Sequence, residues 1–232
     1  MDGSLIQNRV SFGYAKAASI LGAPFNLYRS ATPINPLAVG NLITQVKAST
    51  NITWEYMKGN RYGNALYQIL IDAQYSTSPN SVILGDYIVG IADANGHVLD
   101  NHTYFVVSLE YLLPPQAIQC NSVISVARPS QTTGVGNVGY SGYTVSPVNS
   151  QTVMTAMPAS VLIESRGEKS PIDLPTDTKE PNWLILLPNL GNVQIRVDDI
   201  IFDANNQSFV VTNNELTEFG WRLQAQQVIN AR

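Results

Sequence analysis

Charged residues are scarce in this chain of 232 residues. Lys, Arg, Asp and Glu together make up 13% of the sequence, against about 25% in an average globular protein. The 13 cations are scattered, and the formal net charge is −4. Because binding to nucleic-acid phosphates needs clustered Lys and Arg, the composition argues against a nucleic-acid-binding surface. A polar but weakly charged surface instead suits contacts between proteins, where burying charge is costly.

Cysteine and long apolar runs are also nearly missing. The single cysteine, Cys120, excludes a disulfide within the chain, and its apolar neighbours predict a buried structural thiol. No apolar run approaches the roughly 20 residues that a membrane-spanning helix needs. The first residues also lack the basic and apolar regions of a signal peptide. The sequence therefore predicts a protein without disulfides and without a membrane association.

What the chain does contain is an internal repeat. Two segments share, in the same order, an aliphatic strand led by Asp, an Asp-Ala-Asn turn, and a valine-rich strand with an aromatic residue. The first copy places these features at Asp86, Asp93 and Phe105, and the second places them at Asp199, Asp203 and Phe209. Repeats set the architecture of a chain. Two copies predict two related β-domains rather than a solenoid.

The remaining patterns predict a mostly β protein, with two small antiparallel β-barrel or sandwich domains after a short N-terminal helix. Residues 5–21 favour the helix because they are rich in alanine and end at Gly22. We expect an N-terminal helix and extended arm over 1–40, a first β-domain over 41–128, a Gly/Pro-rich linker or long loop over 129–150, and a second β-domain over 151–232. The candidate core residues are the large aromatics Trp54, Phe105, Trp183, Phe209 and Trp221.

Three patterns suggest chemistry, but their context does not support it. Residues 134–139 have the glycine spacing of a dinucleotide site without the surrounding strand and helix. Residues 93–100 resemble a calcium loop but lack a third acidic ligand and the closing Glu, and Asn95-Gly96 favours a hairpin turn. His97 and His102 lie near Asp100 without any nucleophile motif. We therefore predict no catalytic, cofactor-binding or metal-binding residues, and a protein that is not an enzyme.

The glycine-rich segment is the strongest candidate for contact with another subunit. Loops longer than about 12–15 residues are usually functional or disordered, and this one contains little that could bury itself. We predict an arm that packs on a neighbouring subunit through Gly134, Gly136, Gly139, Tyr140 and Tyr143.

Three stretches carry a family resemblance. They are LGAPFNLYR at 21–29, LLPPQAIQCN at 112–121 and ELTEFGWRL at 215–223. These stretches resemble structural proteins of the head–tail junction in tailed bacteriophages and prophages, of the connector, adaptor or stopper type. The C-terminal part is similar to β-barrel stopper or joining proteins, in which an Asp-led strand, a hairpin and a closing Gly-Trp-Arg-Leu-like strand recur.

The resemblance implies a non-enzymatic virion protein that forms a ring at the neck and joins the portal or connector to the tail. We expect a homo-oligomer of six or twelve subunits, assembled in the bacterial host cytoplasm, with double-stranded DNA only as passing cargo. An alternative within the class is a tail-tube, nozzle or baseplate component. An alternative of another class is a carbohydrate-binding β-module, with an aromatic platform drawn from Trp54, Tyr62, Tyr140 and Tyr143.

Overall fold

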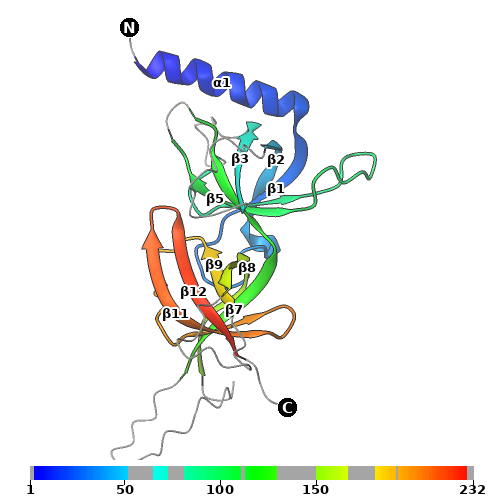
Figure 1. The fold of residues 1–232 in the computed structure, drawn as a ribbon. Coiled ribbons are helices and arrows are strands. Elements are labelled where there is room, and N and C mark those ends of the chain that lie inside the picture. The colour runs from blue at the N-terminus through cyan, green and yellow to red at the C-terminus, as the bar shows by residue number, and fades with distance from the viewer. Residues whose placement is uncertain are drawn as a thin grey trace, which may run out of the picture.

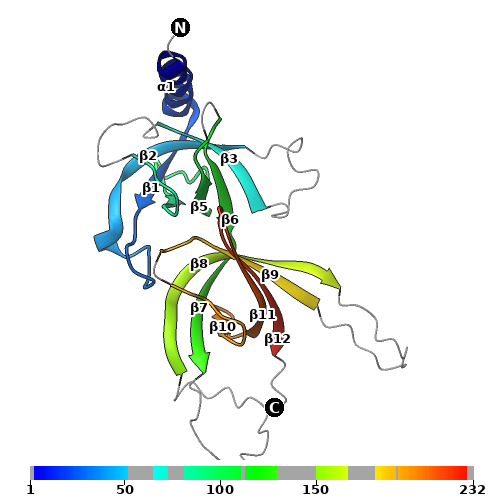
Figure 2. The same ribbon diagram turned by 90° about the vertical axis from the view of Figure 1, so that its left-hand side faces the viewer.

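The structure, a computed structural model, describes residues 3–51, 65–72, 81–110, 113–129, 150–166, 181–191 and 193–228. In these residues an N-terminal helix precedes two closed antiparallel barrels of six strands each. The helix lies across one end of the first barrel, and the second barrel continues the stack at the other end (Figures 1 and 2). The expected fold, mostly β with two small barrels after a short helix, is confirmed.

Helix α1 (Gly3–Leu21) rests on the first barrel through small side chains. Ser11 and Ala18 are buried where the helix meets strands β2 and β3. The helix ends at Gly22, whose amide donates to the carbonyl oxygen of Ala18 at 2.8 Å. A Cβ atom at Gly22 would collide with that same oxygen, so glycine allows the sharp exit from the helix.

The two barrels have the same strand order. The first consists of β1 (Ala23–Tyr28), β2 (Leu42–Asn51), β3 (Leu66–Ile71), β4 (Tyr87–Gly90), β5 (Thr103–Ser108) and β6 (Gln116–Cys120). The second consists of β7 (Ser122–Pro129), β8 (Ser150–Arg166), β9 (Pro181–Leu187), β10 (Ile200–Asp203), β11 (Ser208–Thr217) and β12 (Gly220–Val228). The orders are β1-β2-β3-β6-β5-β4 and β7-β8-β9-β12-β11-β10. Adding six to each strand number of the first barrel gives the second, which makes the chain a structural duplication.

The structure shifts the alignment of the repeat by one residue. In sequence, Phe105 aligns with Phe209. In the structure, the amides of Val106 and Val211 donate to the carbonyl oxygens of the two repeat aspartates, Asp86 and Asp199, both at 2.9 Å. Val106 is therefore equivalent to Val211, and the residues two positions earlier, Tyr104 and Phe209, are equivalent to each other. Because side chains alternate along a strand, Phe105 points out of the first barrel.

Each barrel also contains a buried carboxylate held by one arginine. Asp86 and Asp199 are both 1% exposed, and each accepts two hydrogen bonds from a single guanidinium. Nε and Nη2 of Arg29 lie 2.8 and 2.7 Å from the oxygens of Asp86. The corresponding distances from Arg128 to Asp199 are both 2.9 Å. Backbone amides add one bond to each carboxylate, from Ile83 and Arg196 respectively. The repeat thus preserves a complete polar cluster.

The boundary between the barrels differs from the expected one. Strand 122–129 closes the second barrel rather than ending the first, and strand 23–28 belongs to the first barrel rather than to an N-terminal arm. Each barrel needs its sixth strand to pair its edges. The Gly/Pro-rich segment therefore connects β7 to β8 within the second barrel and is not a linker between domains. Its residues 130–149, with all five predicted arm residues, lie outside the described residues.

Asn121 alone separates the two barrels. Its backbone amide donates to the carbonyl oxygen of Ala159 at 3.0 Å. Its side chain both donates to and accepts from the backbone of Val161, at 2.8 Å in each direction. The linker is therefore itself bonded to the second barrel.

The barrels share a hydrophobic interface. The outward-facing side chains of Tyr87, Phe105, Val107 and Ile118 belong to the same buried cluster as the core of the second barrel. The tyrosine hydroxyl of Tyr87 donates to the carbonyl oxygen of Pro158 at 3.0 Å, and burial raises its pKa well above the usual value. A separate cluster fills the first barrel.

The predicted core aromatic residues differ in how deeply they are buried. Phe105, Phe209 and Trp221 are buried, while Trp183 is half-buried and packs edge-on against Phe209 with ring centroids 5.3 Å apart. Trp54 lies outside the described residues. Cys120 is partly rather than fully buried, since it lies at the edge of the interface between the barrels.

The Tyr87 hydroxyl provides a test of this interface. Tyr87→Phe should lower the free energy of unfolding by about 1–2 kcal/mol, because it leaves the buried Pro158 carbonyl without this donor. Tyr67→Phe is the matched control, since its hydroxyl bonds the more exposed Gln119 at 2.7 Å, and we expect a loss of about 0.5 kcal/mol there. Urea titration measures both. Equal losses of unfolding free energy in the two variants would show that the bond between the barrels stabilises the fold no more than the exposed bond does.

Candidate functional site

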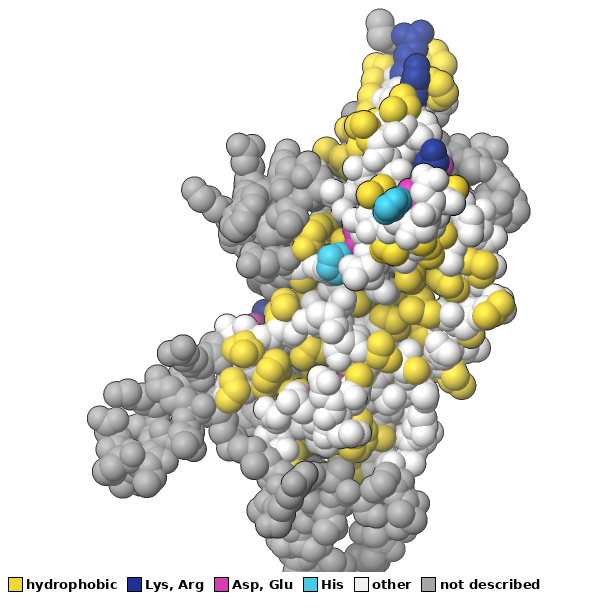
Figure 3. All heavy atoms as spheres, turned by 90° about the vertical axis from the view of Figure 1, so that its right-hand side faces the viewer, with side chains coloured by type: hydrophobic (Ala, Val, Ile, Leu, Met, Phe, Trp, Pro, Cys, Tyr) yellow, Lys and Arg dark blue, Asp and Glu magenta, His cyan; other side chains and the backbone are white. Residues whose placement is uncertain are grey.

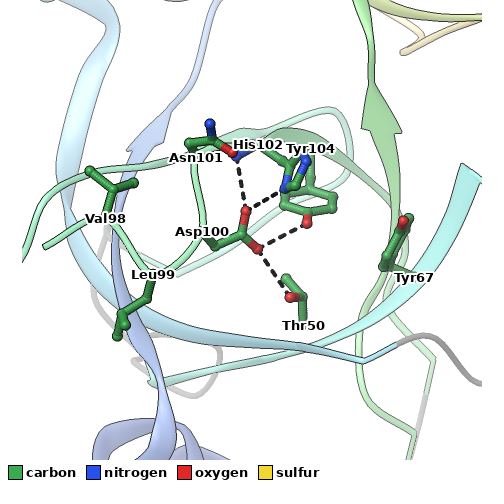
Figure 4. Close-up of a pocket in the computed structure, with 8 residues that line it drawn as sticks. All are labelled: Thr50, Tyr67, Val98, Leu99, Asp100, Asn101, His102 and Tyr104. Carbon is green, nitrogen blue, oxygen red and sulfur yellow. Dashed lines mark hydrogen bonds and ion pairs between the residues drawn. The ribbon is translucent and has the colours of Figure 1, made fainter.

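A wide pocket lies at one side of the first barrel, beside the connection between β4 and β5. Its volume is about 600 Å³. It is lined by residues from that connection and from strands β2, β3 and β5 (Figure 4): Thr50, Tyr67, Val98, Leu99, Asp100, Asn101, His102 and Tyr104.

Asp100 is the polar centre of this pocket. One carboxylate oxygen accepts from the backbone amide of His102 at 2.9 Å and lies 2.8 Å from its Nδ1. The other accepts from the hydroxyls of Tyr104 at 3.0 Å and Thr50 at 3.1 Å (Figure 4). Four contacts therefore occupy the carboxylate, and they tie β2 and β5 to the loop between β4 and β5.

These contacts set the charge of the pocket. Burial by itself would raise the pKa of Asp100, but the hydrogen bonds from His102, Tyr104 and Thr50 outweigh it, and the pKa is lowered. Burial, together with the nearby Asp100 charge, raises the pKa of the Tyr104 hydroxyl. The pocket thus holds an ionised carboxylate beside a protonated phenol at neutral pH.

The close approach of Asp100 to the barrel depends on Gly90. The Gly90 amide donates to the carbonyl oxygen of His102 at 3.1 Å. A Cβ atom at Gly90 would collide with the carbonyl group of Asp100. In the sequence, the local sign of this close contact is Gly90 itself, a glycine at the end of strand β4.

Asp100 and His102 are two residues apart in the sequence, but the sequence does not show their other partners. Thr50, Tyr67 and Tyr104 come from three different strands, and only closure of the barrel places them beside Asp100. Pairing with the carboxylate orients His102. The hydroxyls lining the pocket bond to Asp100 or, for Tyr67, to Gln119 rather than to the imidazole. The arrangement resembles an acid–histidine pair, not a nucleophilic triad.

Asp100 should make stability depend on pH. Its folded pKa is lowered, so its stabilising contribution is present above the unfolded pKa of about 3.9 and is lost as the pH falls through the folded pKa. Asp100→Asn should reduce the free energy of unfolding at pH 7 by about 1–3 kcal/mol and flatten its decline between about pH 5 and 3. Urea titrations across this range measure the effect. The exposed Asp198→Asn serves as the control, and an equal change of slope in both variants would contradict the assignment.

The Asp93 turn is structural in the residues described. One oxygen of Asp93 accepts the amides of Asn95 and His97, both at 2.8 Å. Asp203 accepts the amides of Asn205 and Gln207 in the same way, at 2.9 and 2.7 Å. The turn occurs as the Asn-Gly pattern indicates, with Gly96 at φ +81° and Asn206 at φ +60° in the equivalent positions. No group of three or more potential metal ligands occurs among the described residues.

Helix α1 presents a second candidate site, on the face turned away from the barrel. Several large apolar side chains are exposed there, with Phe12 at 69% and Ile20 at 70%. The helix contains no acidic residue, and its two cations, Arg9 and Lys16, are exposed. Figure 3 shows hydrophobic side chains and the cations together on the helix. We call this surface, made by Leu5, Ile6, Arg9, Phe12, Lys16 and Ile20, the outer helix face.

A third candidate is a small groove between the barrels, next to the tip of the β11–β12 hairpin. Its volume is about 120 Å³. Leu84 and Val107 from the first barrel and Pro188 and Phe219 from the second contribute to its lining. Glu218 is its only charged lining residue in the described part of the chain. We call it the waist groove.

Comparison with models of protein families, with curated proteins and with solved structures found no match for this chain. Within the described residues, no helix combines the length and the apolar character needed to cross a bilayer.

Proposed function

We propose that this chain is a non-enzymatic structural subunit that associates with copies of itself into a ring and joins two unlike protein partners. The observation that carries the proposal is the outer helix face. Phe12 and Ile20 are about 70% exposed, on a helix whose other face is already packed. Apolar side chains gathered on one exposed face commonly mark a protein interaction site.

The duplication supports a joining role. Two barrels of one topology form a stack whose ends differ, because α1 covers one end of the first barrel and the first barrel covers the second (Figure 1). Unlike ends fit unlike neighbours, and head-to-tail contacts between copies can close into a ring.

We propose a location for this subunit from a sequence resemblance. Residues 21–29, 112–121 and 215–223 resemble phage neck proteins. The ring would lie at the head–tail junction of a virion, between the portal or connector and the tail, with DNA passing through its bore. A net charge of −4 suits a passage that does not hold DNA. A station in the tail tube, nozzle or baseplate would use the same properties.

Light scattering after size-exclusion chromatography, with negative-stain microscopy, tests the proposal. Rings of six or twelve copies are the expected result. A protein that stays monomeric up to the highest soluble concentration, alone and with portal and tail proteins, would overturn it.

The Asp100 pocket favours one other candidate, a carbohydrate-binding module. Tyr67, Asn101 and His102 offer an aromatic ring and polar groups in a cavity of about 600 Å³, a combination found in small-ligand sites. Glycan-array binding that Tyr67→Ala abolishes would support this candidate. Absence of any glycan binding would remove it.

A further inference from the structure

We propose that the outer helix face of one copy docks into the waist groove of a second copy, with Phe12 as the inserted side chain. The inference rests on the proposed self-association and names the two surfaces that make the contact. It follows from the position, size and charge of both surfaces.

Phe12 is the natural anchor of the outer helix face. It is 69% exposed, although phenylalanine is usually buried. Arg9 precedes it by three residues and Lys16 follows it by four, so both cations flank it on the same face of the helix. The face thus presents one large aromatic ring between two positive charges.

The waist groove has the complementary character. Leu84, Pro188 and Phe219 contribute apolar surface to its lining. Asn189 adds an amide, and Glu218 supplies a negative charge. The Leu84 side chain is 55% exposed. The volume of the groove, about 120 Å³, corresponds to roughly four water molecules at about 30 Å³ each. The groove is therefore large enough for one large side chain but too small for a whole helix.

The groove cannot receive the helix of its own chain. Helix α1 is fixed against β2 and β3 of the first barrel, at the end of that barrel opposite to the second barrel (Figure 1). The contact must therefore join two copies. Because it pairs different surfaces, it is heterologous, and such contacts produce rings or filaments rather than closed pairs.

The charges of the helix and of the groove are complementary. The helix has cations and no acidic residue, whereas Glu218 is the charged residue among the described residues that line the groove. Matching of opposite charges around an apolar centre gives a contact its specificity and register.

The test measures self-association of the full chain by light scattering and sedimentation. Phe12→Asp should weaken association by at least about 30-fold, as expected for a buried aromatic anchor. Ile163→Asp is the matched control: Ile163 is 61% exposed on strand β8 and belongs to neither surface, so its replacement should leave association unchanged. Circular dichroism confirms folding of each variant.

A charge exchange identifies the partner surface. Lys16→Glu and Glu218→Lys should each weaken association several-fold, and the double variant should recover at least half of the loss, because the opposite charges again face each other. Recovery is possible only if the two residues meet across the contact.

The outcomes separate the two proposals. A wild-type chain that associates, with Phe12→Asp associating equally well, would overturn this contact and leave the proposed function standing. A wild-type chain that never associates would overturn the proposed function. Binding of wild-type protein to anionic phospholipid vesicles that Phe12→Asp abolishes, with self-association unaffected, would assign the helix face to a membrane surface and overturn the docking.

Discussion

Replacing Arg128 by alanine is expected to lower the free energy of unfolding by about 3–5 kcal/mol, because it leaves the buried Asp199 carboxylate without its counter-charge. Asp199 is 1% exposed and accepts two bonds from this guanidinium, both at 2.9 Å. A loss of this size is a large part of the 5–15 kcal/mol that holds an average domain folded. Urea titration monitored by circular dichroism measures it.

The duplication supplies an internal replicate, and an arginine whose carboxylate partners are more exposed supplies a control. Arg29→Ala should cost about as much as Arg128→Ala, since Asp86 is equally buried and equally bonded. Arg222 also contacts a carboxylate, that of Glu164 at 2.8 Å, but Glu164 is 25% exposed. Arg222→Ala should therefore cost only about 1 kcal/mol. Similar losses in all three variants would mean that burial does not determine the effect.

Trp221→Ala should lower the free energy of unfolding by about 3–5 kcal/mol, the usual cost of removing a large aromatic side chain from a core. Trp221 is 6% exposed and belongs to the core cluster of the second barrel. Its strand pairs with β9 on one side and β11 on the other. The lost volume therefore cannot be filled by a small shift of one strand.

Trp221→Phe separates volume from hydrogen bonding. The indole nitrogen of Trp221 is buried without a hydrogen-bond partner in the structure as described, so phenylalanine removes no bond. We expect a loss of only about 1 kcal/mol. Chemical denaturation of both variants provides the comparison. If Trp221→Ala costs less than about 1 kcal/mol, the indole does not support the core.

Local features of the fold were predictable because neighbouring residues determine them. Alanine-rich residues ending at Gly22 give α1, and the Asp93 and Asp203 turns follow from side chains that bond amides two and four residues on. The repeat also predicted two related barrels. The register of the strands was harder to predict, because a strand of aromatic and valine residues can bury either of its two faces. Only the hydrogen bonds between the strands show that Phe209 is equivalent to Tyr104 and not to Phe105.

Long-range contacts account for what the sequence did not reveal. Arg29 and Asp86 are 57 residues apart, and Arg128 and Asp199 are 71 apart. In a chain with 13% charged residues, an arginine at the end of the first strand of each copy was an available signal for these pairs. The Asp100 pocket had no such signal, since Thr50 and Tyr67 become its neighbours only when β2, β3 and β5 are placed in one barrel.

The single-residue connection at Asn121 has a mechanical consequence. A joint that is one residue long, with its side chain bonded in both directions to Val161 at 2.8 Å, leaves no hinge between the barrels, and the buried Tyr87–Pro158 bond resists twisting. We therefore expect the two barrels to keep a fixed separation and a fixed relative rotation. A load applied at the helix end would reach the far end of the second barrel without being absorbed between them.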